Sequence, residues 1–290
     1  EKIINNAKAT MPKVLFDMEY MCEFADDSLG FFKQRDIVEA TSKFPDGWGP
    51  LTGAAGNKRY VIGVDPARNT DRFAIVVVEL GNPMKIVYVW ACQGKKYSYG
   101  AKQVRKVKRL FNAVGIGMDT GGGGYAVEEL LNTSEVMKET DKRIYREDDE
   151  DHNDGEKILH MIDFSSGWID QANTSLQKNI EDRTLMFPIP VNTDAKDLEK
   201  ELITDEINDL KRELMSIEFT LTKTGKRHFD LMPTTKSSAE DVAKHKDRYS
   251  ALLIANWIAT KLIHPDVNQM TSPMSAELKN LQPHLDPYPS

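Results

Sequence analysis

Short apolar runs alternate with longer amphipathic stretches along most of this chain. Three runs rich in β-branched and aromatic residues predict strands at Tyr60–Val64, Phe73–Leu80 and Lys85–Ala91. A turn signal, Gly81-Asn82-Pro83, separates the second run from the third. We therefore expect these two strands to pair antiparallel.

Downstream, helical patterns alternate with apolar runs. They predict, in chain order, a helix at Tyr99–Asn112, a buried strand at Val114–Met118, a helix at Gly124–Leu131, a strand near Ile158–Phe164, a helix near Gly167–Glu181, a short strand at Leu185–Ile189 and a charged helix over 194–213. Two runs, Ser216–Leu221 and Arg227–Leu231, flank a short loop containing Gly, which is typical of a β-hairpin. An apolar helix begins at Asp247. This order predicts an α/β fold, with a mixed sheet covered by helices.

Composition shifts divide the chain into three parts. An amphipathic helix is expected over 13–25, and residues 41–58 are rich in Gly and Pro. We therefore expect an N-terminal linker or arm at 1–58, a main domain at 59–264 and an irregular tail at 265–290. Because the chain begins with Glu1 and not with methionine, we expect it to be a piece of a longer polypeptide.

Charge and cysteine content exclude several classes of function. The 290 residues carry a net charge of −7, so the chain as a whole is not a basic nucleic-acid binder, although local basic patches remain open. Two cysteines are too few for a disulfide framework or a cysteine-based zinc site. No apolar run reaches the roughly 18 residues of a membrane span, so no membrane partner is expected.

Three aspartates lie at the ends of apolar elements. Asp65 follows one predicted strand, Asp119 follows another, and Asp247 opens the apolar helix on the same helical face as Ala251 and Ile254. Because this face is apolar and begins with a small residue, we expect the helix to lie close to the sheet and to direct its aspartate at the sheet's edge.

Several acids without clustered Cys or His favour Mg²⁺ or Mn²⁺. A fourth acid, Asp71, lies six residues after Asp65, so the loop between them could fold both towards one point. Two such ions could activate water against a phosphodiester and stabilise the leaving oxygen. Four glycines, Gly121–Gly124, follow the second motif and would allow the backbone to approach a phosphate or metal. They do not form a Walker A loop, so a nucleotide-driven motor would lie outside this chain.

Basic residues gather close to the predicted acidic site. Lys223, Lys226 and Arg227 occupy the hairpin tip, and Lys246 and Arg248 flank Asp247. If the substrate is a polyanion, we expect these five side chains to contact its phosphates, because positive charge beside an acidic site suits positioning of the backbone. Little base readout is expected, since no segment resembles a recognition helix.

These motifs resemble the C-terminal nuclease domain of the large terminase subunit of tailed bacteriophages, the DNA-packaging motor. The likeness covers about residues 15–262. The matching stretches are Phe16–Tyr20, Gly30–Phe32, Gly63–Pro66 with Asp71, Gly117–Gly124, the hairpin over 216–231 and His245–Leu252. The three acidic motifs are the diagnostic part. Many members carry two consecutive acids in the third motif, whereas here Lys246 precedes Asp247, which removes one ligand for a second metal.

The resemblance implies an RNase H-like fold with a β-hairpin insertion. It implies a metal-dependent endonuclease that cuts concatemeric double-stranded DNA during genome packaging. Asp65, Asp119 and Asp247 match the family's catalytic metal ligands, and Asp71 matches an accessory acid. The implied partners are double-stranded DNA, the portal protein, the small terminase subunit and an ATPase domain of the same polypeptide. The implied location is the host cell cytoplasm, with no place in the mature virion.

Three other interpretations are open at this point. Another RNase H-like enzyme, such as a Holliday-junction resolvase, would cut branched DNA. An actin-like or sugar-kinase-type ATPase would use Gly121–Gly124 to hold phosphates, but such a fold usually repeats a strand-Asp-Gly motif, and only one copy is found. A module that docks on the portal ring without chemistry would not need the three acids.

Overall fold

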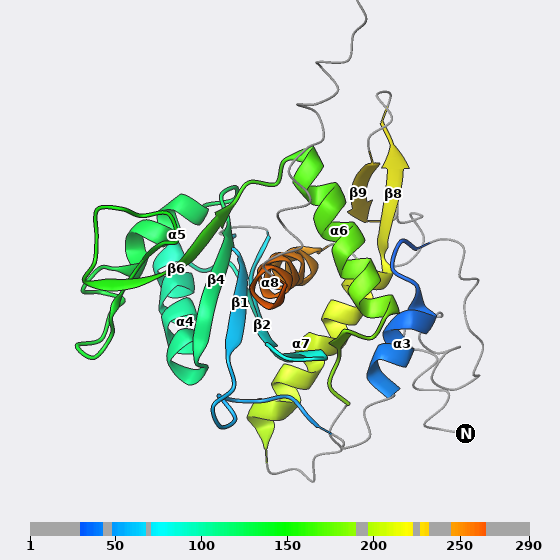
Figure 1. Ribbon diagram of the computed structural model, residues 1–290, viewed down its shortest axis with the longest axis horizontal. Helices are drawn as coiled ribbons and strands as arrows, with labels where there is room; N and C mark the ends of the chain where they lie inside the picture. The colour runs from blue at the N-terminus through cyan, green and yellow to red at the C-terminus, as the bar shows by residue number, and fades with distance from the viewer. Residues whose placement is uncertain are drawn as a thin grey trace, which may run out of the picture.

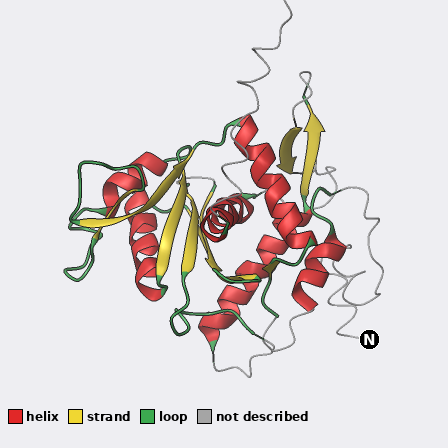
Figure 2. Ribbon diagram, in the orientation of Figure 1, coloured by secondary structure: helices red, strands yellow, loops and turns green. Residues whose placement is uncertain are grey.

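A mixed β-sheet forms the centre of the molecule (Figures 1 and 2). The computed structural model describes residues 30–42, 48–67, 71–189, 197–222, 227–231 and 245–264. The strands of the sheet are β1 (Tyr60–Asp65), β2 (Arg72–Glu79), β3 (Met84–Gln93), β4 (Ala113–Asp119), β5 (Arg143–Arg146), β6 (Gly155–Ile162) and β7 (Leu185–Met186). A separate hairpin consists of β8 (Ile217–Leu221) and β9 (Arg227–Leu231).

The strand order is β5-β6-β4-β1-β2-β3-β7. The predicted antiparallel pairing of β2 with β3 is confirmed, and β1 also runs antiparallel to β2. On its other side β1 runs parallel to β4, with Val64 opposite Met118. Because parallel strands end at the same edge of a sheet, this register brings Asp65 and Asp119, the next residue of each strand, out at one edge.

Helices cover both faces of the sheet. They are α3 (Gln34–Ser42), α4 (Tyr97–Leu110), α5 (Gly124–Leu131), α6 (Ser166–Glu181), α7 (Leu198–Met215) and α8 (Asp247–Ile263). Figure 1 shows α4 and α5 on one side and α8 on the other, with α6 and α7 beyond α8. No helix among the described residues is long and apolar enough to cross a membrane.

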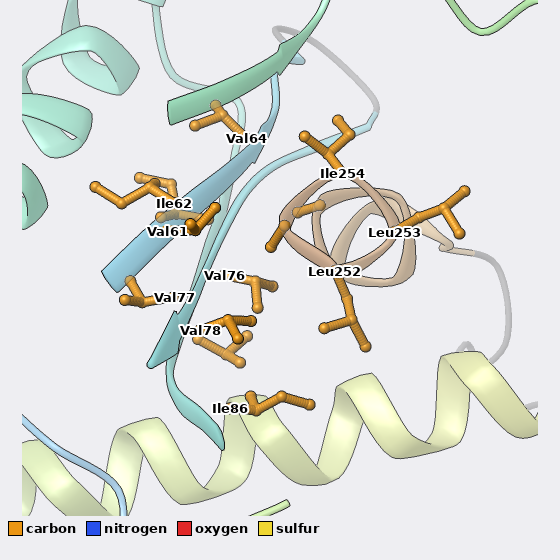
Figure 3. Packing of buried hydrophobic residues seen from close by; sticks show 14 of the residues in the cluster. Val61, Ile62, Val64, Val76, Val77, Val78, Ile86, Leu252, Leu253 and Ile254 are labelled. Atoms are coloured by element: carbon orange, nitrogen blue, oxygen red, sulfur yellow. The ribbon is translucent and has the colours of Figure 1, made fainter. Parts of the chain in front are cut away.

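The helix α8 is covered on nearly all sides. It lies against β1, β2 and β4 and is flanked by α6 and α7. Figure 3 shows the side chains of Leu252 on α8 and Ile86 on β3 packed where the sheet, α8 and α7 meet. Both side chains are fully buried. The prediction of an apolar, covered helix that begins at Asp247 is confirmed.

The described part of the predicted N-terminal arm packs on the main domain. Phe31 donates its backbone N–H to Ile217 at 2.8 Å, and its ring makes edge-to-face contact with Phe229 of the hairpin. Leu51 donates to Val87 of β3 at 2.8 Å. The predicted helix over 13–25 and the tail over 265–290 lie outside the described residues.

Some elements differ from the sequence expectation. The helix α3 and the strand β5 were not predicted, and β6 begins at Gly155 because the edge strand β5 pairs with its first residues. The strand predicted at Leu185–Ile189 ends at Met186. Its continuation bonds to the arm instead, because Phe187 donates to Ala40 and Ile189 to Trp48.

Candidate active site

Asp65, the last residue of β1, lies where the strand meets the first turn of α8. The side chain of Ser250, in the first turn of α8, lies beside its carboxylate. Burial raises the pKa of Asp65 well above its ordinary value, and the negative charges of Asp247 and Asp119 raise the pKa further. The three predicted aspartates are therefore close enough to influence one another.

Asp119 ends β4 and turns the chain into a glycine loop. Its Oδ1 accepts the backbone N–H of Gly121 at 3.0 Å. Burial raises the pKa of Asp119; the Gly121 bond acts in the opposite direction, and the charge of Asp163 adds to the rise. Asp163 directly follows β6, the parallel neighbour of β4. It is an acid that the sequence analysis missed, although the same strand-end rule applies to it.

The glycines after Asp119 make this turn tight. Gly122 and Gly123 have φ values of 57° and 121°, which other residues rarely adopt. The carbonyl of Gly122 accepts the hydroxyl of Tyr97 at 2.5 Å, and a Cβ on Gly122 would lie 2.5 Å from the carbonyl oxygen of Pro66. The loop after β4 thus packs directly on the loop after β1, which holds the two strand-end acids side by side.

Asp247 approaches the same edge from α8. Its Oδ2 accepts the backbone N–H of Arg72, the first residue of β2, at 3.2 Å, and Nδ1 of His245 lies 3.5 Å from this oxygen. Burial raises the pKa of Asp247, and the charge of Asp71 acts in the same direction. Asp71 itself is exposed at the rim. The structure therefore brings all four predicted acids towards one end of the sheet.

This acidic group suits a hard divalent cation. The atoms that the three aspartates offer to a metal ion are all carboxylate oxygens, which hard divalent cations prefer. A bound cation would also relieve the repulsion that raises the pKa of Asp65. Among the described residues, no three Asp, Glu, His or Cys side chains are placed to hold an ion together. Joint ligation would therefore require these carboxylates to draw closer, a movement that a bound cation favours.

Arg248 lies in a different place from the one expected. Its side chain is only 3% exposed, and its guanidinium pairs with Glu206, Asp209 and Glu213 of α7 at 2.6, 3.0 and 2.7 Å. The expectation that Arg248 contacts DNA is wrong for this structure, because its charged group is buried away from solvent. The three acids recur at helical spacing along α7, and this pattern could have revealed a shared buried partner.

The remaining basic residues divide into two groups. Lys246 is half-exposed beside Asp247 and lies 3.0 Å from Asp230 of β9. Arg227 extends from the hairpin to α6, where its Nε donates to Asp170 at 2.5 Å and its Nη2 to Thr174 at 2.9 Å. Lys223 and Lys226 lie outside the described residues. The hairpin is thus joined both to α6 and to the segment that leads into α8.

Comparison with known proteins relates part of this chain to phage terminases. Residues 62–147 match the family model described as the terminase RNaseH-like domain. The chain is 27% identical over 135 residues to the probable terminase ATPase subunit of Haemophilus phage HP1, covering 44% of this chain and 22% of that protein. It is 28% identical over 122 residues to the terminase ATPase subunit of Escherichia phage P2, covering 39% and 21%. The chain therefore spans about a fifth of the length of these relatives.

A solved structure shares the fold. The large terminase nuclease of the thermophilic phage G20c, crystallised with bound cobalt, superposes with a TM-score of 0.53 over 80% of this chain and 98% of that one, at 14% identity. The family match contains Asp65, Asp71 and Asp119, and the mixed sheet flanked by helices agrees with it. Residues 62–147 therefore resemble a terminase RNaseH-like domain, as the acidic motifs indicated, and the fold of the described residues agrees with that of a large terminase nuclease.

Proposed function

We propose that this domain is a divalent-metal-dependent endonuclease that cuts concatemeric double-stranded DNA during phage genome packaging. The observation that carries the proposal is the convergence of Asp65, Asp119 and Asp247 from two parallel strands and one helix. Burial raises the pKa values of all three acids, and the charges of Asp247 and Asp119 raise that of Asp65 further. A divalent cation would offset the cost of gathering these carboxylates at one end of the sheet, and such sites are typical of phosphodiester hydrolysis.

The proposed metal ligands are Asp65, Asp119 and Asp247, with Asp71 as an accessory acid at the rim. Mg²⁺ or Mn²⁺ fits their oxygen donors, and two ions together would polarise the phosphate and assist both the attacking and the leaving oxygen. The bound cobalt of the G20c nuclease supports divalent metal use by this fold. Lys246 stands where many terminases have another acid, so the second ion would rely on fewer protein ligands.

The protein groups have distinct tasks in this proposal. The backbone N–H groups of Gly121 and Arg72 each hold one carboxylate oxygen, of Asp119 and Asp247 respectively, and so fix the direction of these acids. Lys246, together with Lys223, Lys226 and Arg227 of the hairpin, positions DNA phosphates. Such contacts carry little sequence information, which suits an enzyme with little base preference.

The wider context follows from the relatives. Two are terminase ATPase subunits, so we propose that an ATPase domain of the same polypeptide delivers DNA to this domain. The portal protein and the small terminase subunit are the other proposed partners. The proposed place of action is the host cell cytoplasm.

A cleavage assay on two substrates tests the proposal. The full chain is incubated with a linear duplex or a four-way junction of equal length, with Mn²⁺, Mg²⁺ or EDTA. We expect cutting of the linear duplex with either metal and none with EDTA. Selective cutting of the junction would instead favour a resolvase, and no cutting of either substrate would leave only a docking role.

A further inference from the structure

The most completely built polar cluster outside the proposed metal site lies directly behind it. Glu213 of α7 is buried, and its two carboxylate oxygens have different partners at the start of α8. Oε1 accepts from Nη1 of Arg248 at 2.7 Å, and Oε2 accepts the backbone N–H of Tyr249 at 2.9 Å. Both partners lie within two residues of Asp247. The Glu213 side chain therefore holds the backbone two residues after the proposed third metal ligand and the side chain of the residue next to it.

The same turn is fixed on its other side. The hydroxyl of Tyr249 donates to Oδ1 of Asn173 on α6 at 2.6 Å. The first turn of α8 is thus held between α6 and α7 through the hydrogen bonds of Tyr249 with Asn173 and Glu213. Since an N–H in the first turn of a helix has no partner within the helix, the Glu213 carboxylate satisfies a group that would otherwise be buried unpaired.

The other carboxylates around Arg248 act differently. Glu206 and Asp209 accept from its Nε and Nη2, and among the residues that the structure describes neither acid bonds to the backbone of α8. They offset the charge of Arg248 without fixing where the helix begins. This difference separates Glu213 from two acids that share its helix and its arginine.

We propose that Glu213 is a positioning residue that sets the place of Asp247 relative to Asp65 and so determines the affinity of the site for a divalent cation. This inference rests on the proposed function in supposing that the site takes a metal. Outer groups that orient metal ligands commonly change affinity by about 10- to 100-fold when they are removed. Glu213→Gln cannot accept from both partners, because its amide nitrogen is a donor.

Calorimetric titration with Mn²⁺, without DNA, tests the inference on the full chain. We expect Glu213→Gln to bind Mn²⁺ roughly tenfold more weakly than the wild type. The matched control is Asp209→Asn, which removes the same charge from the same helix and should stay within about twofold of the wild type. Glu213→Asp, which keeps the charge but is too short to reach both partners, should also weaken binding, and it replaces Glu213→Gln if that variant does not fold.

The outcomes separate this inference from the proposed function. Equal Mn²⁺ affinity in the wild type and in the folded Glu213 variant would overturn the positioning role, as would equal weakening by Asp209→Asn. A wild type that binds Mn²⁺ but leaves duplex DNA intact would overturn the nuclease proposal alone. A wild type that binds no Mn²⁺ would overturn both.

Discussion

A Cβ atom on Gly63 would lie 2.0 Å from the carbonyl oxygen of Ala251 and 2.7 Å from the backbone nitrogen of Ala255. The backbone of β1 therefore touches the backbone of α8 with no side chain between them. Because Asp65 is two residues beyond Gly63 and Asp247 is one helical turn before Ala251, this contact fixes the separation of two proposed metal ligands. At Gly117 on β4 the side chains of Ile254 and Ile258 of α8 occupy the space that a Cβ would take.

Gly63→Ala should therefore be destabilising. The added methyl meets backbone atoms that cannot rotate away, so we expect a loss of about 3 kcal/mol in the free energy of unfolding, measured in urea. Gly167→Ala is the matched control, since nothing lies within 4 Å of a Cβ at that helical position. It should change stability by no more than about 1 kcal/mol. Similar losses in both variants would contradict the close contact of β1 with α8.

Asp65→Asn should stabilise the metal-free protein at neutral pH. The folded-state pKa of Asp65 is raised, so the protonated acid favours folding below its unfolded pKa, near 3.8, and this contribution is lost as pH rises through the folded value. At pH 7 the cost of burying this acid opposes folding, and its replacement by the neutral amide should contribute on the order of 1 kcal/mol. Urea unfolding at pH 7 and pH 3.5 measures the difference, which should vanish at the lower pH.

A divalent metal ion should reverse the order of stability, so that the wild type becomes more stable than Asp65→Asn. Saturating Mn²⁺ binds the folded wild type and should raise its Tm by several degrees, corresponding to about 3 kcal/mol at a hundredfold excess over Kd. Asp65→Asn should show a much smaller rise. Thermal melts with and without Mn²⁺ check this, and an equal rise in the two proteins would show that the ion binds somewhere else.

Arg248→Met should destabilise the fold far more than Arg227→Met. The first variant leaves Glu206, Asp209 and Glu213 close together without their shared cation, and breaking a buried pair costs about 3–5 kcal/mol. The pair between Arg227 and Asp170 is partly exposed, so its loss should cost about 1 kcal/mol or less. Urea unfolding of both variants decides the point. Comparable losses of unfolding free energy in the two variants would contradict the claim that Arg248 forms a buried ion-pair cluster.

Lys246→Ala should weaken DNA binding in a salt-dependent way. Loss of one phosphate contact should lower the slope of log affinity against log salt concentration by about 1. Lys178→Ala, at an exposed lysine that pairs with Asp182 on the far end of α6, is the control and should leave the slope unchanged. Binding of a short duplex at several salt concentrations gives both slopes. An unchanged slope for Lys246→Ala would assign this lysine to the hairpin contact with Asp230 alone.

Much of the sheet was predictable from local sequence. Runs rich in β-branched and aromatic residues predicted β1 to β3, and a turn signal predicted how β2 and β3 pair. The strand order was not predictable, because β4 joins β1 through a contact between residues about 53 apart in the chain, which no local pattern encodes. The two-residue strand β7 is short because a distant segment, the arm, supplies the partners for its continuation.

The candidate site was partly predictable for similar reasons. A strand-end rule predicted the places of Asp65 and Asp119, and helix periodicity predicted the face that places Asp247 against the sheet. The role of Arg248 could not be predicted from its neighbours in sequence, because its partners lie on α7, 35 to 42 residues earlier. A basic residue beside an acid suggests phosphate binding until the fold shows which side faces solvent.

Cleavage of supercoiled plasmid with Mn²⁺ by the wild type and by Asp65→Ala tests the nuclease proposal most directly. Asp182→Ala, at an exposed acid that pairs with Lys178, serves as the control for a general loss of charge. We predict that the wild type and Asp182→Ala relax and linearise the plasmid, while Asp65→Ala is slower by at least about 100-fold, because it lacks a proposed metal ligand. Cutting by folded Asp65→Ala at the wild-type rate would contradict the assignment of the site.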